Sequence, residues 1–87
     1  MQRNLKFIFG EINPKNAIAS GTLAEIYAEL GNDNEFNKNL QLSFIFGMNS
    51  ENFERIIKEE EVYKKYFKEE RFLNLLKTYR IKINFPE

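Results

Sequence analysis

Gly31 lies between two segments whose apolar residues recur at helical spacing, and this arrangement constrains the fold more than any other feature. A glycine at the end of a helix can adopt the left-handed conformation that closes it. Residues 32–34, Asn-Asp-Asn, then provide good turn and N-cap side chains. The sequence therefore predicts two helices, over about 17–30 and 34–46, that run antiparallel on either side of Gly31. The second of them is supported by apolar residues four apart, namely Phe36, Leu40 and Phe44.

The second half of the chain predicts further helices and a short tail. Ser50 and the acidic residues after it are typical of a helix start. The apolar stripe of this third helix consists of Phe53, Ile56, Ile57, Tyr63 and Phe67. A last helix over about 69–80 is predicted by apolar residues at i, i+3, i+4 and i+7. With residues 81–86 as an extended tail, the chain, 1–87, is expected to form one all-α domain of about four to five helices.

Four residues of the first predicted helix and its turn stand at characteristic positions of tetratricopeptide repeats. Leu23 and Ala24 match the Leu-Gly pair of that family, Tyr27 follows three residues later, and Gly31 comes four residues further on at the turn. Residues 17–47 therefore resemble one hairpin of a tetratricopeptide repeat. The resemblance implies a short helical repeat fold.

The flanking segments extend this resemblance to the rest of the chain. Pro14 stands where the closing proline of a preceding unit would be, which implies that residues 1–12 are a truncated half-repeat. Residues 50–80 resemble the terminal helices that follow many such arrays. One departure is Phe36, at a site where these repeats usually have alanine, and overpacking costs about 1–3 kcal/mol. We therefore expect the two helices of the hairpin to splay or reorient around Phe36.

The resemblance also implies a binding surface on the first helix of the hairpin. Its residues would be Ile18, Gly21, Glu25, Ala28 and Glu29. Family members that bind a carboxylate place Lys, Asn and Arg on this surface, so its two glutamates favour a basic or apolar ligand segment instead. The implied function is a non-catalytic protein–protein interaction or adaptor module with a protein or peptide partner. Because repeat units bury their faces only against neighbours, a homodimer or a partner is expected to cover the free apolar end.

A repeated tetrapeptide supports an alternative fold. Phe-Ile-Phe-Gly occurs at 7–10 and again at 44–47, and aromatic and β-branched residues are favoured in strands. Strands at 5–9, 41–46 and 81–85 would give a compact α/β protein. Such a protein could be a mobile-element-encoded inhibitor that binds one host protein. Both folds stay open at this point.

The residue inventory excludes most catalytic chemistry. The chain has no histidine and no cysteine, which removes the commonest general base, the thiol nucleophile and the ligands of structural zinc. Clustered carboxylates could supply an acid/base pair or a site for a hard metal, but they stand among lysines and are expected to be solvated. These carboxylates are Glu59, Glu60, Glu61, Glu69 and Glu70. We expect no enzyme activity, no metal and no cofactor.

The charge balance and the hydropathy pattern bear on partners and location. Thirteen basic and thirteen acidic residues cancel, so net charge provides no general attraction to phosphate, and nucleic acid is not the expected partner. No apolar run approaches the roughly 18 residues of a membrane span, so no membrane partner is expected. The absence of cysteine suits a reducing compartment, and a cytoplasmic location is the expectation.

Overall fold

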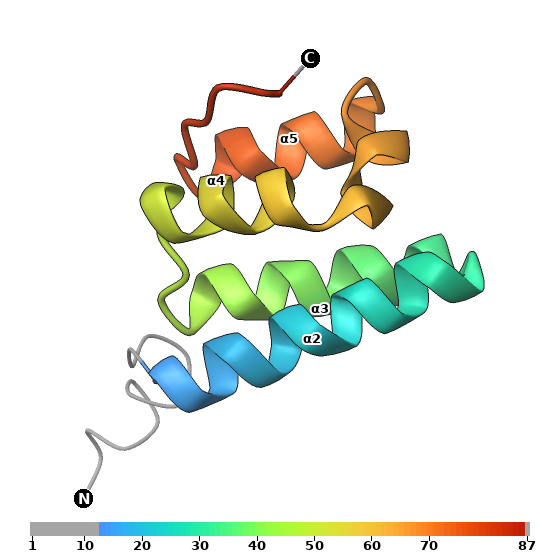
Figure 1. The fold of residues 1–87 in the computed structure, drawn as a ribbon. Coiled ribbons are helices and arrows are strands. Elements are labelled where there is room, and N and C mark those ends of the chain that lie inside the picture. The colour runs from blue at the N-terminus through green and yellow to red at the C-terminus, as the bar shows by residue number, and fades with distance from the viewer. Residues whose placement is uncertain (1–12, 87) are drawn as a thin grey trace, which may run out of the picture.

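A computed structural model describes residues 13–86, and this part of the chain is all-α, as predicted. It contains four α-helices and one 3-10 helix, with no strand between residues 13 and 86. In chain order they are α2 (Pro14–Leu30), α3 (Asp33–Ile45), α4 (Ser50–Glu59), η1 (Glu61–Tyr66) and α5 (Glu70–Thr78). The pair α2 and α3 forms one layer, and α4 and α5 form a second layer over it (Figure 1).

Capping residues and a glycine determine where α2 begins and where the chain turns into α3. Helix α2 begins three residues earlier than predicted, because the Asn13 side chain accepts a hydrogen bond from the Asn16 backbone N–H and Pro14 suits the first helical position. Gly31 closes α2 with φ 79°, in the left-handed conformation. Asn32 then caps α3 by accepting from the backbone N–H of Glu35 at 3.2 Å. The predicted turn at Gly31 is confirmed.

Helix α2 packs on α3 through small residues. Its buried positions are Ala17, Ser20, Gly21, Ala24 and Ala28. Because these side chains are short, the two helix axes can approach closely, and α2 contributes little side-chain volume to the core. The large core residues come instead from α3 and from the elements that follow it in the chain.

Aromatic rings fill the space between the two layers. Phe36 is fully buried and stacks on Tyr66 with ring centroids 3.9 Å apart and an interplanar angle of 7°. Phe53 meets Phe44 and Tyr63 edge to face, at 5.2 Å and 5.5 Å between centroids. The ring partners of Phe36 therefore belong to η1 and α5. The sequence led us to expect that this large side chain would obstruct the packing of the hairpin, but it is accommodated in the core between the two layers.

The predicted third helix is divided into two elements. Helix α4 ends at Glu59, Glu60 is extended, and the chain continues as the 3-10 helix η1. In a 3-10 helix, side chains three apart point in the same direction. This geometry directs both Tyr63 and Tyr66 into the core, where each is 1% exposed. The Tyr66 hydroxyl also donates to Asp33 Oδ1 at 2.7 Å, which ties η1 to the start of α3.

The alternative α/β fold is wrong for the two described segments on which it relied. Residues 41–45 lie inside α3, and residues 81–86 have no regular secondary structure. The segment 41–46 has helical as well as strand character, since Leu40 and Phe44 are four apart and both are buried in the core. The third proposed strand, 5–9, lies outside the described residues.

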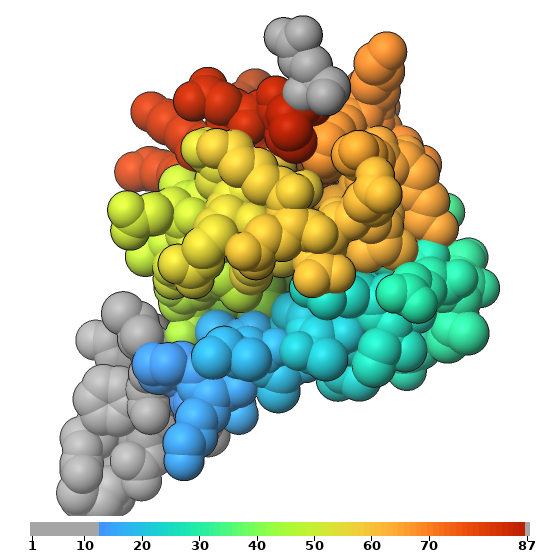
Figure 2. Space-filling model, in the orientation of Figure 1, coloured from blue at the N-terminus to red at the C-terminus, as the bar shows by residue number. Residues whose placement is uncertain are grey.

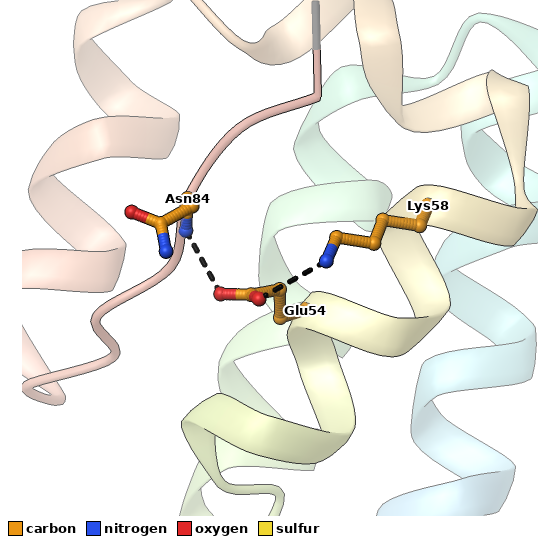
Figure 3. Close-up of polar contacts among 3 residues, drawn as sticks. All are labelled: Glu54, Lys58 and Asn84. Carbon is orange, nitrogen blue, oxygen red and sulfur yellow. Dashed lines mark hydrogen bonds and ion pairs between the residues drawn. The ribbon is translucent and has the colours of Figure 1, made fainter.

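The tail after α5 is held by side chains of α4. Figure 3 shows the Glu54 carboxylate accepting hydrogen bonds from the backbone N–H of Asn84 at 2.8 Å and from Lys58 Nζ at 3.2 Å. The bond from Asn84 and then the one from Lys58 lower the pKa of Glu54 below its ordinary value. Ile81 is buried, and the ring of Phe85 lies 4.8 Å from that of Phe67. Residues 81–86 thus cover the α4–α5 layer on the side away from α2 (Figure 1).

Two glycines of the hairpin allow a matched test of its backbone. A Cβ at Gly21, in the middle of α2, would lie 3.5 Å from Met48 Cε, which is an ordinary contact. Gly21→Ala should therefore raise the free energy of unfolding by about 0.5–1 kcal/mol. Gly31→Ala should lower it by about 1 kcal/mol, because φ is 79° there and nothing lies within 4 Å to gain as a contact. Urea unfolding followed by circular dichroism checks both, and the same sign for both variants would contradict the expectation.

Candidate protein-binding surface

The side of α2 that faces away from α3 is apolar and exposed. We call it the outer face of α2 and define it by Ile18, Thr22, Leu23, Ile26 and Leu30. The exposed fractions of its four large apolar side chains are 66% for Ile18, 44% for Leu23, 48% for Ile26 and 72% for Leu30. Figure 2 shows α2, coloured blue to cyan, at the surface along the lower edge of the molecule. Four large apolar side chains on one helix face are typical of an interaction site rather than of scattered surface leucines.

Helix α2 is therefore unusual for a surface helix. A helix at the edge of a globular fold normally has polar residues on its solvent side, and one that is apolar all round is normally buried. Here the small residues face the protein interior and, apart from the half-buried Tyr27, the large apolar ones face outward. Of the five large hydrophobic side chains that are exposed in residues 13–86, only Leu73 lies outside α2. A partner bound to the outer face would bury these exposed apolar side chains.

The residues of the binding surface implied by the sequence are divided between the exposed and the buried sides of α2. Ile18 and Glu29 are both exposed on the same side of the helix, about 16 Å apart along its axis. Gly21 lies against Met48, and Ala28 is fully buried, with its carbonyl accepting a hydrogen bond from Lys65 Nζ. Glu25 is half-buried. A partner can therefore reach Ile18 and Glu29, while Gly21 and Ala28 face other parts of the same chain.

The sequence reasoning missed three of the exposed apolar residues, Leu23, Ile26 and Leu30. A signal for them was available, because large apolar residues and small residues occupy opposite sides of the predicted helix over 17–30. Three of the five residues implied by the resemblance, Gly21, Glu25 and Ala28, lie on the side that η1 and Met48 cover. The large side chains mark the side that stays open.

Glu25 links the inner edge of α2 to η1. Tyr63 donates its hydroxyl hydrogen to Glu25 Oε2 at 3.5 Å. Partial burial raises the pKa of Glu25, the charge of Glu60 raises it further, and the hydrogen bond from Tyr63 opposes both. Burial, together with the nearby Glu25 charge, also raises the pKa of Tyr63, so the phenol stays protonated and acts as a donor at neutral pH. Glu25 is thus turned toward the protein interior and away from the outer face.

This pKa shift predicts a small pH dependence of stability. Because the pKa of Glu25 is higher in the folded than in the unfolded chain, the folded state binds more protons between the two values. Its ionisation therefore costs stability above the folded pKa, and this cost disappears as the pH falls to the unfolded value. Glu25→Gln should be more stable than the wild type at pH 7, by a few tenths of a kcal/mol after solvent screening. The difference should vanish near pH 4, which urea unfolding at both pH values would show; a variant less stable at pH 7 would contradict the sign.

A hollow continues the outer face at the start of α2. It has a volume of about 210 Å³ and lies between the first turn of α2, the α3–α4 connection and α4. Its wall includes Pro14, Ile18, Met48 and Ile56, with Arg55 at the polar edge. Ile18 belongs both to this hollow and to the outer face. The two together form one surface that could receive apolar side chains.

The clustered carboxylates of the second half do not gather into such a site. Glu59, Glu60, Glu69 and Glu70 are exposed, and Glu61 pairs with Lys64 at 2.8 Å. Within residues 13–86, no group of three or more carboxylates is placed to hold a metal ion. As to membranes, every helix in the described part of the chain is too short or too polar to pass through a bilayer. The outer face of α2 remains the strongest candidate surface.

The hairpin α2–α3, the second layer above it and the apolar outer face all follow from residues 13–86. Comparison of the chain with protein-family models, with curated proteins and with solved structures finds no match.

Proposed function

We propose that this chain is a non-catalytic protein–protein interaction module of tetratricopeptide-repeat-like type, and that its partner binds the outer face of α2. The observation that carries this proposal is the exposure of Ile18, Leu23, Ile26 and Leu30 on one side of a single helix. Burying a large aliphatic side chain is worth about 1.5–3 kcal/mol. Four such side chains can therefore drive association with another apolar surface.

The helical architecture supports this proposal. A hairpin that turns at Gly31 is followed by a second helical layer, in the order that a short repeat array would have. In such arrays each unit buries its faces against neighbours, so a terminal face is apolar until something covers it. The outer face of α2 has this character. A partner segment with apolar side chains fits it better than a carboxylate terminus does, because four of the five residues that define the face are large and apolar.

The residue inventory also favours binding over catalysis. With no histidine and no cysteine in the chain, general-base and thiol chemistry would depend on carboxylates, lysines and tyrosines. The carboxylates in question are solvated, and the buried tyrosines have raised pKa values that keep them protonated. This chain would then act by binding a partner through the shape and the apolar area of its surface.

Site-specific photo-crosslinking tests the proposed surface. A photoreactive phenylalanine, p-benzoylphenylalanine, is placed at Ile26 on the outer face or, as the matched control, at Leu73 on α5, which is exposed to a similar degree. Irradiation in the source cells should give discrete protein adducts from position 26 and none from position 73. Adding Leu30→Glu should remove the adducts while circular dichroism stays unchanged. Equal adducts at both positions, or none at position 26, would contradict the proposal.

A further inference from the structure

The residues along the solvent side of α2 are arranged symmetrically about Thr22. Lys15, Ile18, Thr22, Ile26 and Glu29 follow one another at intervals of three, four, four and three residues. At about 100° per residue they all lie within a strip roughly 80° wide, with Thr22 at its middle. A rise of about 1.5 Å per residue places Lys15 and Glu29 each about 10 Å from Thr22, in opposite directions along the axis. The strip thus has an isoleucine on each side of its central threonine, a positive residue at one end and a negative residue at the other.

This symmetry makes the strip complementary to itself. If a second α2 crosses the first in the antiparallel direction with Thr22 at the two-fold axis, Lys15 of each copy meets Glu29 of the other. Ile18 of each copy lies level with Ile26 of the other, on opposite sides of the central Thr22, and Leu23 and Leu30 of both copies flank one edge of the contact. We propose that the partner on the outer face is a second copy of this chain, bound antiparallel through α2 with two Lys15–Glu29 ion pairs. This inference rests on the proposed function, since it names the partner of the same surface.

The charges select the antiparallel direction. A parallel pair would place Lys15 against Lys15 and Glu29 against Glu29, and like charges on facing helices are unfavourable. Both side chains are exposed, and the ion pairs that form within residues 13–86 involve other residues, Lys58 with Glu54 and Lys64 with Glu61. Glu25 does not interfere, because its carboxylate accepts from Tyr63 on the inner side of α2. Each end of the strip therefore has a complementary charge to meet in the second copy.

The size of the surface sets the strength of the association. Helix α2 has 17 residues and is about 25 Å long, so two such helices bury less than the roughly 1,200 Å² of a typical stable interface. We therefore expect a reversible dimer with a dissociation constant on the order of 10–100 μM, weaker than that of an obligate dimer. At nanomolar concentration the chain should be a monomer.

Exchanging the two charges provides the test. Sedimentation equilibrium between 5 and 500 μM is measured for the wild type, Lys15→Glu, Glu29→Lys and an equimolar mixture of the two variants. Each variant alone turns two attractive pairs into two repulsive ones, so its self-association should be about tenfold weaker than that of the wild type. In the mixture, Glu at position 15 of one chain meets Lys at position 29 of the other, and the native Lys15 and Glu29 pair at the opposite end. A heterodimer as strong as the wild-type dimer is expected, and high salt should reduce these differences.

The controls separate this inference from the proposed function. Ile26→Glu should abolish association, Leu73→Glu should leave it unchanged, and circular dichroism should show all variants folded. A wild type that stays monomeric at 500 μM, or single variants that associate as strongly as the wild type, would overturn the antiparallel dimer. If position 26 still crosslinks to a different protein, the proposed function stands and only the second copy is refuted. If neither a dimer nor a crosslink at position 26 is found, both are refuted.

Discussion

Phe36→Ala should lower the free energy of unfolding by about 3–5 kcal/mol, as expected when a fully buried aromatic side chain is truncated. Phe36 is fully buried among other aromatic rings: its ring centroid lies 3.9 Å from that of Tyr66 and within 6.3 Å of those of Tyr63 and Phe72. Removing it leaves a cavity between the two helical layers in addition to the lost apolar burial. Since small domains have total stabilities near 5 kcal/mol, much of the variant should be unfolded at 37 °C.

Urea unfolding followed by far-ultraviolet circular dichroism measures this effect. Phe36→Leu is the conservative comparison and should cost less, because most of the apolar volume is kept. Leu73→Ala is the surface control and should change stability by no more than about 0.5 kcal/mol, since that side chain is 39% exposed. A loss below 1 kcal/mol for Phe36→Ala would mean that the ring is not at the centre of the core.

Ala24→Leu should have the second-largest effect, a loss of about 1–3 kcal/mol. Ala24 is fully buried on the side of α2 that packs on α3, where every buried residue of α2 is small. Three additional heavy atoms have no free space there, so α2 has to shift away from α3 or the side chain has to adopt a strained rotamer. The loss should appear as a lower midpoint of urea unfolding.

Ala19→Leu is the matched control, because it makes the same change in the same helix at an exposed position. It should alter stability by no more than about 0.5 kcal/mol. Equal losses for Ala19→Leu and Ala24→Leu would show that helix propensity, and not close packing on α3, decides the result. A stabilising Ala24→Leu would contradict the packing of α2 on α3 outright.

The parts of the fold that were predictable from the sequence are those set by local chemistry. Gly31 and Asn32 determine the turn between α2 and α3 through backbone conformation and capping, and neither depends on distant residues. The break between α4 and η1 could not be found in this way. No glycine or proline lies near Glu60 to mark the break. The change to a 3-10 helix places Tyr63 and Tyr66 in a core that is formed by residues distant in sequence.

The candidate binding surface also depends on contacts with residues distant in sequence, which local patterns do not predict. The sequence shows that α2 is apolar on more than one side, but which side becomes covered depends on where η1 and Met48 return in space. A repeat resemblance placed Gly21 and Ala28 on the accessible side, and both are buried. Ile18 and Glu29 are accessible because they lie further round the helix, away from these contacts.

The tail over the α4–α5 layer has a consequence for the size of any assembly. Residues 81–86 lie on the side of the molecule away from α2, with Ile81 buried and Asn84 bonded to Glu54. A further helical layer could not stack on that side without displacing them. Pairing through α2 uses the same surface on both copies and is complete once two have met. Assembly should therefore stop at the dimer, and raising the concentration should not produce filaments.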